Sequence, residues 1–133
     1  MLALALCALT VAACQVIYPT PVATRTVTVD ISGLDRLEIS HQVKEGSVVN
    51  VEVSVTQPGE EGVECAVPTV HDAHGNVMAT LSPVNGQRGR DTRYMYSFVA
   101  ATDGRYTVEF DNGQCAARQA ETRADVVWKV REP

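Results

Sequence analysis

Hydrophobic and polar residues alternate with a period of two over most of the chain after Thr26. The clearest case is residues 49–56, where valine occupies every second position and Asn, Glu, Ser and Thr lie between. Successive side chains of a β-strand point to opposite faces of the sheet, so this pattern predicts a strand with one buried face and one solvated face.

The same alternation predicts strands elsewhere, and clusters of Gly, Pro, Asn and Asp separate them, as at 57–59, 72–76 and 82–89. The residues that share a parity in each segment are Val27, Val29 and Ile31; Leu37 and Ile39; Val63, Cys65 and Val67; Met78 and Thr80; Tyr94, Tyr96 and Phe98; Tyr106, Val108 and Phe110; Val126, Trp128 and Val130. Residues 116–124 are expected to form a loop. The pattern predicts an all-β fold, an antiparallel β-sandwich or jelly roll of about eight strands with very little helix.

The first thirteen residues form a different pattern, because they are apolar except for Thr10. Such a segment is too short to span a bilayer, which takes about 20 residues. It ends at Val11-Ala12-Ala13-Cys14, which resembles the lipobox of bacterial lipoproteins. The resemblance implies that residues 1–13 are a signal peptide and that Cys14 becomes the lipidated N-terminus. An ordinary cleaved secretory signal is the alternative.

The segment that follows is expected to connect the lipid to a folded domain. Residues 14–24 contain Pro19 and Pro21 and few groups that could pack, which is typical of an extended tether. At about 3.1 Å per residue the tether would reach roughly 30 Å, so the domain at 25–133 should lie close to the membrane. The protein is then expected to be exported and anchored to the cell membrane or outer membrane, facing the periplasm or the exterior.

Cysteine usage agrees with export. The chain has cysteines at 7, 14, 65 and 115. Removal of the signal peptide and lipidation of Cys14 would leave Cys65 and Cys115, and two cysteines in an exported domain favour a disulfide. Neither lies in the CxxC or Cys/His spacing of zinc sites. Closing this loop would stabilise the fold by roughly 4 kcal/mol in the chain-entropy model.

The second half of the chain resembles a known family. Residues 97–115 read SFVAATDGRYTVEFDNGQC, and VVWKV follows after a polar stretch. This succession is similar to the GOLD domain, a β-sandwich of eukaryotic cargo receptors and bacterial surface proteins, and KEGSVVNVEVSV and VHDAHGNVM look like its upstream strand and hairpin. The likeness covers about 100 residues and implies a protein-contact module rather than an enzyme.

Charge and local motifs narrow the function further. The net charge of −5 argues against nucleic acid or anionic lipid as the main partner. His71 and His74 are spaced i, i+3, but they flank a predicted hairpin turn, where the rings should diverge, so no metal or other cofactor is expected. No G-x-S-x-G elbow is present, and Glu60 and Glu61 are adjacent and should point apart, so no enzyme is indicated.

Two kinds of partner follow from these observations, an envelope protein or a glycan. The preferred function is a non-enzymatic module that contacts protein partners. The alternative is carbohydrate binding, in which Tyr94, Tyr96 or Trp128 would stack against sugar rings. These three residues, however, occupy the apolar positions of their alternating segments, which favours a place in the core. The locally basic loop 85–90 adds Arg88 and Arg90 as candidate ligand contacts.

Overall fold

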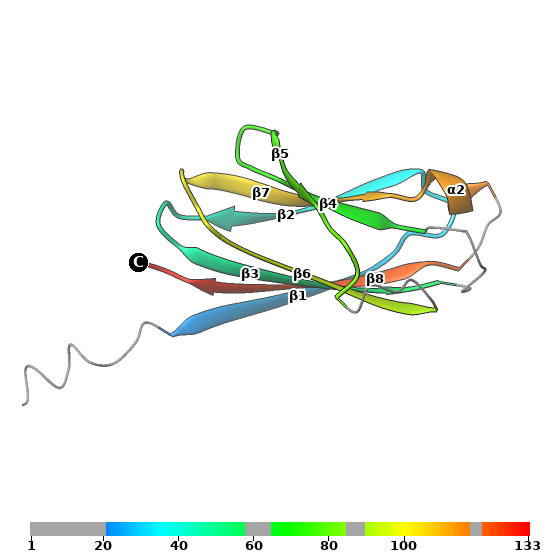
Figure 1. Cartoon of the computed structure of the whole chain (residues 1–133), viewed down its shortest axis with the longest axis horizontal. Helices are drawn as coiled ribbons and strands as arrows, with labels where there is room; N and C mark the ends of the chain where they lie inside the picture. Colours follow the sequence, from blue (N-terminus) through cyan, green and yellow to red (C-terminus); the bar gives the residue numbers. More distant parts are fainter. Residues whose placement is uncertain (1–20, 58–64, 85–89, 118–120) are drawn as a thin grey trace, which may run out of the picture.

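Two four-stranded antiparallel sheets pack face to face in a β-sandwich (Figure 1). The computed structural model describes residues 21–57, 65–84, 90–117 and 121–133. The first sheet contains, in spatial order, β1 (Val22–Asp30), β8 (Arg123–Arg131), β3 (Val48–Thr56) and β6 (Asp91–Val99). The second contains β2 (Arg36–Val43), β7 (Gly104–Asp111), β4 (Val67–His71) and β5 (Val77–Thr80). The predicted all-β fold class is confirmed.

The core lies between the sheets and follows the predicted alternation. Val49, Val51, Val53 and Val55 of β3 are buried, whereas the residues between them face outward or are half-buried. The largest fully buried side chains come from both sheets. They are Trp128 of β8 and Tyr94 of β6 in the first sheet, and Tyr106 and Phe110 of β7 in the second. Because valine is small, these aromatic side chains fill much of the volume of the core.

Two expected boundaries differ from the structure. β1 begins at Val22 rather than after residue 24, because Val22, Ala23 and Thr24 pair with the end of β8. A short helix, α2 (Gly113–Ala116), lies just before the segment expected to form a loop. Cys14 and Arg88, together with Glu60 and Glu61, lie outside the described residues. Within the described part of the chain, no helix is long and apolar enough to cross a bilayer.

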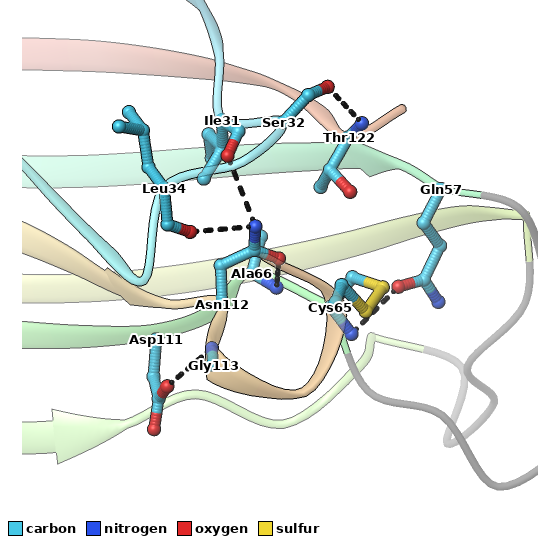
Figure 2. The surroundings of a disulfide bond; sticks show 11 residues. Ile31, Ser32, Leu34, Gln57, Cys65, Ala66, Asp111, Asn112, Gly113 and Thr122 are labelled. Atoms are coloured by element: carbon cyan, nitrogen blue, oxygen red, sulfur yellow. Dashed lines mark hydrogen bonds between the residues drawn. A yellow bond between two sulfur atoms is a disulfide. The ribbon is translucent and has the colours of Figure 1, made fainter. Parts of the chain in front are cut away.

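The predicted disulfide joins Cys65 to Cys115. Both residues are buried, at the start of the chain leading into β4 and within α2 (Figure 2). The side-chain amide of Gln57 accepts a hydrogen bond from the Cys65 backbone N–H at 2.9 Å. The disulfide therefore ties the start of the second sheet's β4 to the helix after β7, next to the end of β3.

Cys65 and Val67 do not share a buried face as the alternation predicted, and Val63 lies outside the described residues. In β4 the buried residues are Pro68 and Val70, whereas Val67 is only half-buried. The intervening Ala66 has a positive φ of 52°, so the backbone turns before the strand begins and the face that points inward changes. Because Ala66 has this left-handed conformation, the buried positions of β4 do not continue the alternation that begins at Cys65.

The opposite end of the sandwich carries the Asp-Gly-x-Tyr segment. The backbone N–H of Glu45 donates to the Asp103 carboxylate at 2.6 Å, which joins the β2–β3 turn to the β6–β7 turn. The Tyr106 hydroxyl donates to the carbonyl of Thr102 at 2.8 Å. This segment therefore works as a structural corner, in which a buried tyrosine fixes the turn that precedes its own strand.

Candidate functional site

The outer face of the second sheet contains an open pocket with charged walls. Its volume is about 470 Å³, and it lies over β2, β7 and β4 beside the β4–β5 turn. We call it the Glu109 pocket; its lining residues are Arg36, Glu38, His71, Asp72, Ala73, Gly75, Arg105, Thr107 and Glu109. The walls carry both positive and negative side chains, so the pocket suits a polar, charged ligand surface rather than an apolar molecule.

Strand register explains how these charges come together. Glu38 of β2 lies directly opposite Glu109 of β7, and like charges at such positions repel. Arg36 offsets the repulsion, because its guanidinium lies 2.7 Å from Glu109 Oε1 and 3.6 Å from Glu38 Oε1. Glu109 is only 20% exposed, so its carboxylate is held in a fixed place by the arginine and the sheet.

His71 approaches Glu109 from the other side. Its Nε2 lies 3.3 Å from Glu109 Oε2, and its Nδ1 lies 3.3 Å from the carbonyl oxygen of Gly75. The Glu109 carboxylate is therefore placed between an arginine and a histidine ring.

The β4–β5 turn forms one wall and holds the histidines apart. The Asp72 carboxylate accepts hydrogen bonds from the backbone N–H groups of Asn76 and His74, both at 2.9 Å. The Asn76 bond is the largest cause that lowers the pKa of Asp72 below its ordinary value, so the turn carries a negative charge. His71 faces Glu109 and His74 is exposed. Among the described residues, no group of three or more His, Cys, Asp or Glu could hold a metal ion.

A second pocket lies at the disulfide end of the sandwich. It has a volume of about 420 Å³ and is lined by Thr56, Gln57, Arg90, Glu121 and Arg123. The structure therefore places the predicted contact residue Arg90 near a second arginine, Arg123 of β8. The two are 33 positions apart in the sequence, and the pairing of β3 with both β6 and β8 brings them to the same end of the sheet.

Two of the three aromatic residues proposed as sugar-stacking platforms lie in the core. Trp128 is 1% exposed and Tyr94 is 2% exposed, because both face the second sheet from the inner face of the first. Tyr96 is half-buried and stacks against Phe98, with ring centroids 5.8 Å apart. The interpretation of Trp128 and Tyr94 as glycan contacts is wrong; the expectation that they build the core is confirmed.

The Glu109 pocket could not be recognised in the sequence. Its main residues lie on alternating outward positions of two strands distant in sequence, 36 and 38 in β2 and 105, 107 and 109 in β7. Each set is an ordinary solvated strand face when considered alone. The β2–β7 register joins them, and a sequence shows that register only when the pairing of the strands is known.

Comparisons with known proteins show the fold and not the family. No family model and no curated protein matches the chain. The lipase BlEst2 of Bacillus licheniformis, in its propeptide form, is similar over 86% of this chain and 22% of its own, with 11% identity and a TM-score of 0.53. The cyanophage Pam1 capsid asymmetric unit is similar over 87% of this chain and 88% of its own, with 13% identity and a TM-score of 0.51.

A third similar structure is PliG of Aeromonas hydrophila, a periplasmic inhibitor of g-type lysozyme. It covers 84% of this chain and 88% of its own, with 13% identity and a TM-score of 0.49. Identities this low leave function to be argued from the residues of the chain itself.

Proposed function

We propose that this protein is an exported, lipid-anchored binding module that acts without catalysis and contacts a protein partner through the Glu109 pocket. The observation that carries the proposal is the fixed position of Glu109 between Arg36 and His71 on the outer face of a sheet. Charges of both signs can select a partner by electrostatic complementarity. Because these side chains are already held in place, little conformational entropy is lost when the partner binds.

The side chain best placed to meet a partner is Arg105. It lines the same pocket on β7, is exposed, and faces Gln42 across the β2–β7 pair. A guanidinium can bind a carboxylate through two parallel hydrogen bonds, which gives geometric selectivity. We therefore expect the partner to present an acidic side chain to Arg105.

Two features of the sequence support the proposed setting. The lipobox-like Val11-Ala12-Ala13-Cys14 favours anchoring at a membrane surface, and a buried disulfide is typical of proteins that fold in an oxidising compartment. The resemblance of residues 97–130 to the GOLD domain favours protein contact. These features agree with one another but rest on different residues.

Charge reversal tests the binding surface. In Arg105→Glu the pocket loses the guanidinium and gains a negative charge, and Arg93→Glu makes the same change on the outer face of the other sheet. Each protein is used to capture partners from the native envelope by affinity purification and cross-linking. We expect Arg105→Glu to lose a protein that the natural chain and Arg93→Glu both retain. Equal recovery with both variants would contradict the use of this pocket.

The lipid anchor has its own test. Cells producing the natural chain or Cys14→Ala are supplied with a clickable fatty acid, and the protein is purified and assayed for the label. We expect label on the natural chain alone. Equal labelling of both proteins, or of neither, would remove the anchor from the proposal and leave the pocket to be judged by charge reversal.

A further inference from the structure

Three exposed valines lie in one row across the outer face of the first sheet. Val22 of β1 pairs with Arg131 of β8, Arg131 pairs with Val48 of β3, and Val48 pairs with Val99 of β6. The valines are 44%, 48% and 61% exposed, respectively. We call Val22, Val48 and Val99 the valine row.

The same sheet face is polar at its other end. There the corresponding row consists of Asp30, Arg123, Thr56 and Asp91, again one residue from each strand. Three of the four strands thus carry an apolar residue at one outer end, and three of the four carry a charged residue at the other. Met95, midway along β6 and 45% exposed, is a further apolar side chain on this face. Exposed apolar side chains gathered at one end of a sheet face indicate a contact with something other than water.

The valine row lies where the chain enters the domain. Val22 is the first residue of β1, and β1 begins at the same end of the sandwich as the C-terminus (Figure 1). Cys14 precedes Val22 by eight positions in the sequence. Eight residues span at most about 29 Å, so a lipid on Cys14 would hold this end of the domain near the bilayer.

We propose that the valine row docks on the surface of the phospholipid bilayer and so orients the domain on the membrane. This inference rests on the lipid anchor of the proposed function. Val22, Val48 and Val99 would lie at the boundary between headgroups and acyl chains, and Arg131, between two of them, would reach the lipid phosphates. Lys129, on the same face, is ion-paired with Glu52 at 3.1 Å, so Arg131 is the cation that this contact would use.

The tether allows a patch as small as the valine row to orient the domain on the membrane. Three partly exposed valines and an arginine bind a bilayer too weakly to hold a free domain there. A short tether, however, raises the effective concentration of the patch at the surface to about the millimolar range. The lipid therefore keeps the protein on the membrane, and the valine row decides which face of the protein is turned towards it.

This orientation leaves both pockets accessible. The Glu109 pocket lies on the outer face of the second sheet, on the far side of the core from the valine row. The pocket with Arg90 and Arg123 lies at the disulfide end, away from the start of β1. A partner arriving from the compartment beyond the membrane would meet these surfaces first.

Depth-dependent quenching tests the orientation. The full-length lipidated chain is reconstituted into phosphatidylethanolamine–phosphatidylglycerol vesicles that contain a lipid with a nitroxide near its headgroup. Val99→Trp and Asp91→Trp place the same probe at the two ends of the outer face of β6, and the natural chain gives the contribution of the buried Trp128. We expect about threefold or more stronger quenching of the added tryptophan at 99 than at 91.

A further substitution separates the valine row from the preference of tryptophan for interfaces. Adding Val48→Ser to Val99→Trp should lower the quenching at 99 about twofold or more, since the neighbouring contact is lost. Equal quenching at 99 and 91, or stronger quenching at 91, would overturn the proposal. Self-association of the chain that Val48→Ser abolishes, without quenching at 99, would overturn it in favour of a contact between two copies.

Separate measurements test the lipid anchor and the proposed orientation. A full-length chain that does not float with the vesicles contradicts the anchor. In that case residues 1–14 are replaced by a hexahistidine segment bound to a nickel-chelating lipid, which leaves the described fold intact and attaches the same end of the chain to the bilayer. The quenching comparison between positions 99 and 91 then decides the orientation by the same criteria.

Discussion

Asn112 Oδ1 accepts a hydrogen bond from the backbone N–H of Ala66 at 3.1 Å, across 46 positions of sequence. Ala66 has a positive φ of 52°, a conformation that costs an L-residue roughly 1–2 kcal/mol. The Asn112 amide nitrogen donates to the carbonyls of Ile31 and Leu34 at 3.1 and 3.0 Å (Figure 2). One buried side chain therefore holds the strained residue beside the disulfide and the turn after β1.

Asn112→Ala should be strongly destabilising. The substitution would leave the Ala66 N–H and the Ile31 and Leu34 carbonyls without their present partner in a buried region. We expect the free energy of unfolding to fall by about 3–5 kcal/mol, measured by urea denaturation. Asn50→Ala is the matched control, since Asn50 bonds only the Ser97 hydroxyl on the exposed face, and it should cost about 0.5 kcal/mol or less. Similar losses in both variants would contradict the role assigned to Asn112.

Gly104→Ala should destabilise the β6–β7 corner. Gly104 has φ +151°, and a Cβ added there would lie 2.5 Å from the Ala73 Cβ. We expect a loss of about 2 kcal/mol or more in the free energy of unfolding, from strain and overlap together. Gly75→Ala provides the comparison, because its φ is +82° and nothing lies within 4 Å of the added Cβ, so it should cost about 1 kcal/mol. Ala73→Gly should recover part of the loss at 104; an absence of recovery would contradict the overlap.

The strands and the core could be predicted because the alternation of side chains is local, and the disulfide because two cysteines remain once Cys7 and Cys14 are assigned to the signal peptide and the lipid. A period of two places Val51 and Tyr94 in the core wherever their strands pair. The inward side of β4 could not be predicted, because the positive φ of Ala66 is imposed by Asn112 from a distant segment. The Glu109 pocket was missed for a related reason: Glu38 and Glu109 become neighbours only through the β2–β7 register.

Reduction of the disulfide should lower stability without changing the fold class. Cys65 and Cys115 are 50 positions apart, and a loop of this length contributes about 4 kcal/mol by restricting the unfolded chain. Urea denaturation with and without reductant measures the difference, and both thiols should resist alkylation until reduction. A Cys65→Ala/Cys115→Ala chain serves as the control, because reductant should not alter it. Stability unaffected by reductant in the natural chain would contradict this contribution.

Trp128 should report the core and not a ligand site. It is the single tryptophan of the chain and is 1% exposed, so its emission should be blue-shifted and resist quenching by iodide. Added oligosaccharides should leave the spectrum unchanged. A red-shifted emission in the folded protein, or a spectral response to sugar, would contradict the burial of this ring.

The pH dependence of stability should depend on His41. The ring stacks on Trp128, with centroids 5.4 Å apart, and its Nδ1 is buried with no hydrogen-bond partner among the residues that the structure describes. Burial, and secondarily the charge of Arg25, holds the pKa of His41 below its ordinary value of 6.5. Above that value the ring is neutral in both the folded and the unfolded chain. As the pH falls through 6.5 the unfolded chain takes up more protons than the folded one, so the free energy of unfolding decreases.

His41→Phe separates this titration from the other histidines. Phenylalanine keeps an aromatic ring against Trp128 but cannot bind a proton, so the fall in melting temperature between about pH 7.5 and pH 5.5 should become smaller. His74→Gln removes an exposed histidine from the β4–β5 turn and should leave the fall as it is in the natural chain. The assignment would be wrong if His41→Phe retained the full pH dependence of the natural chain.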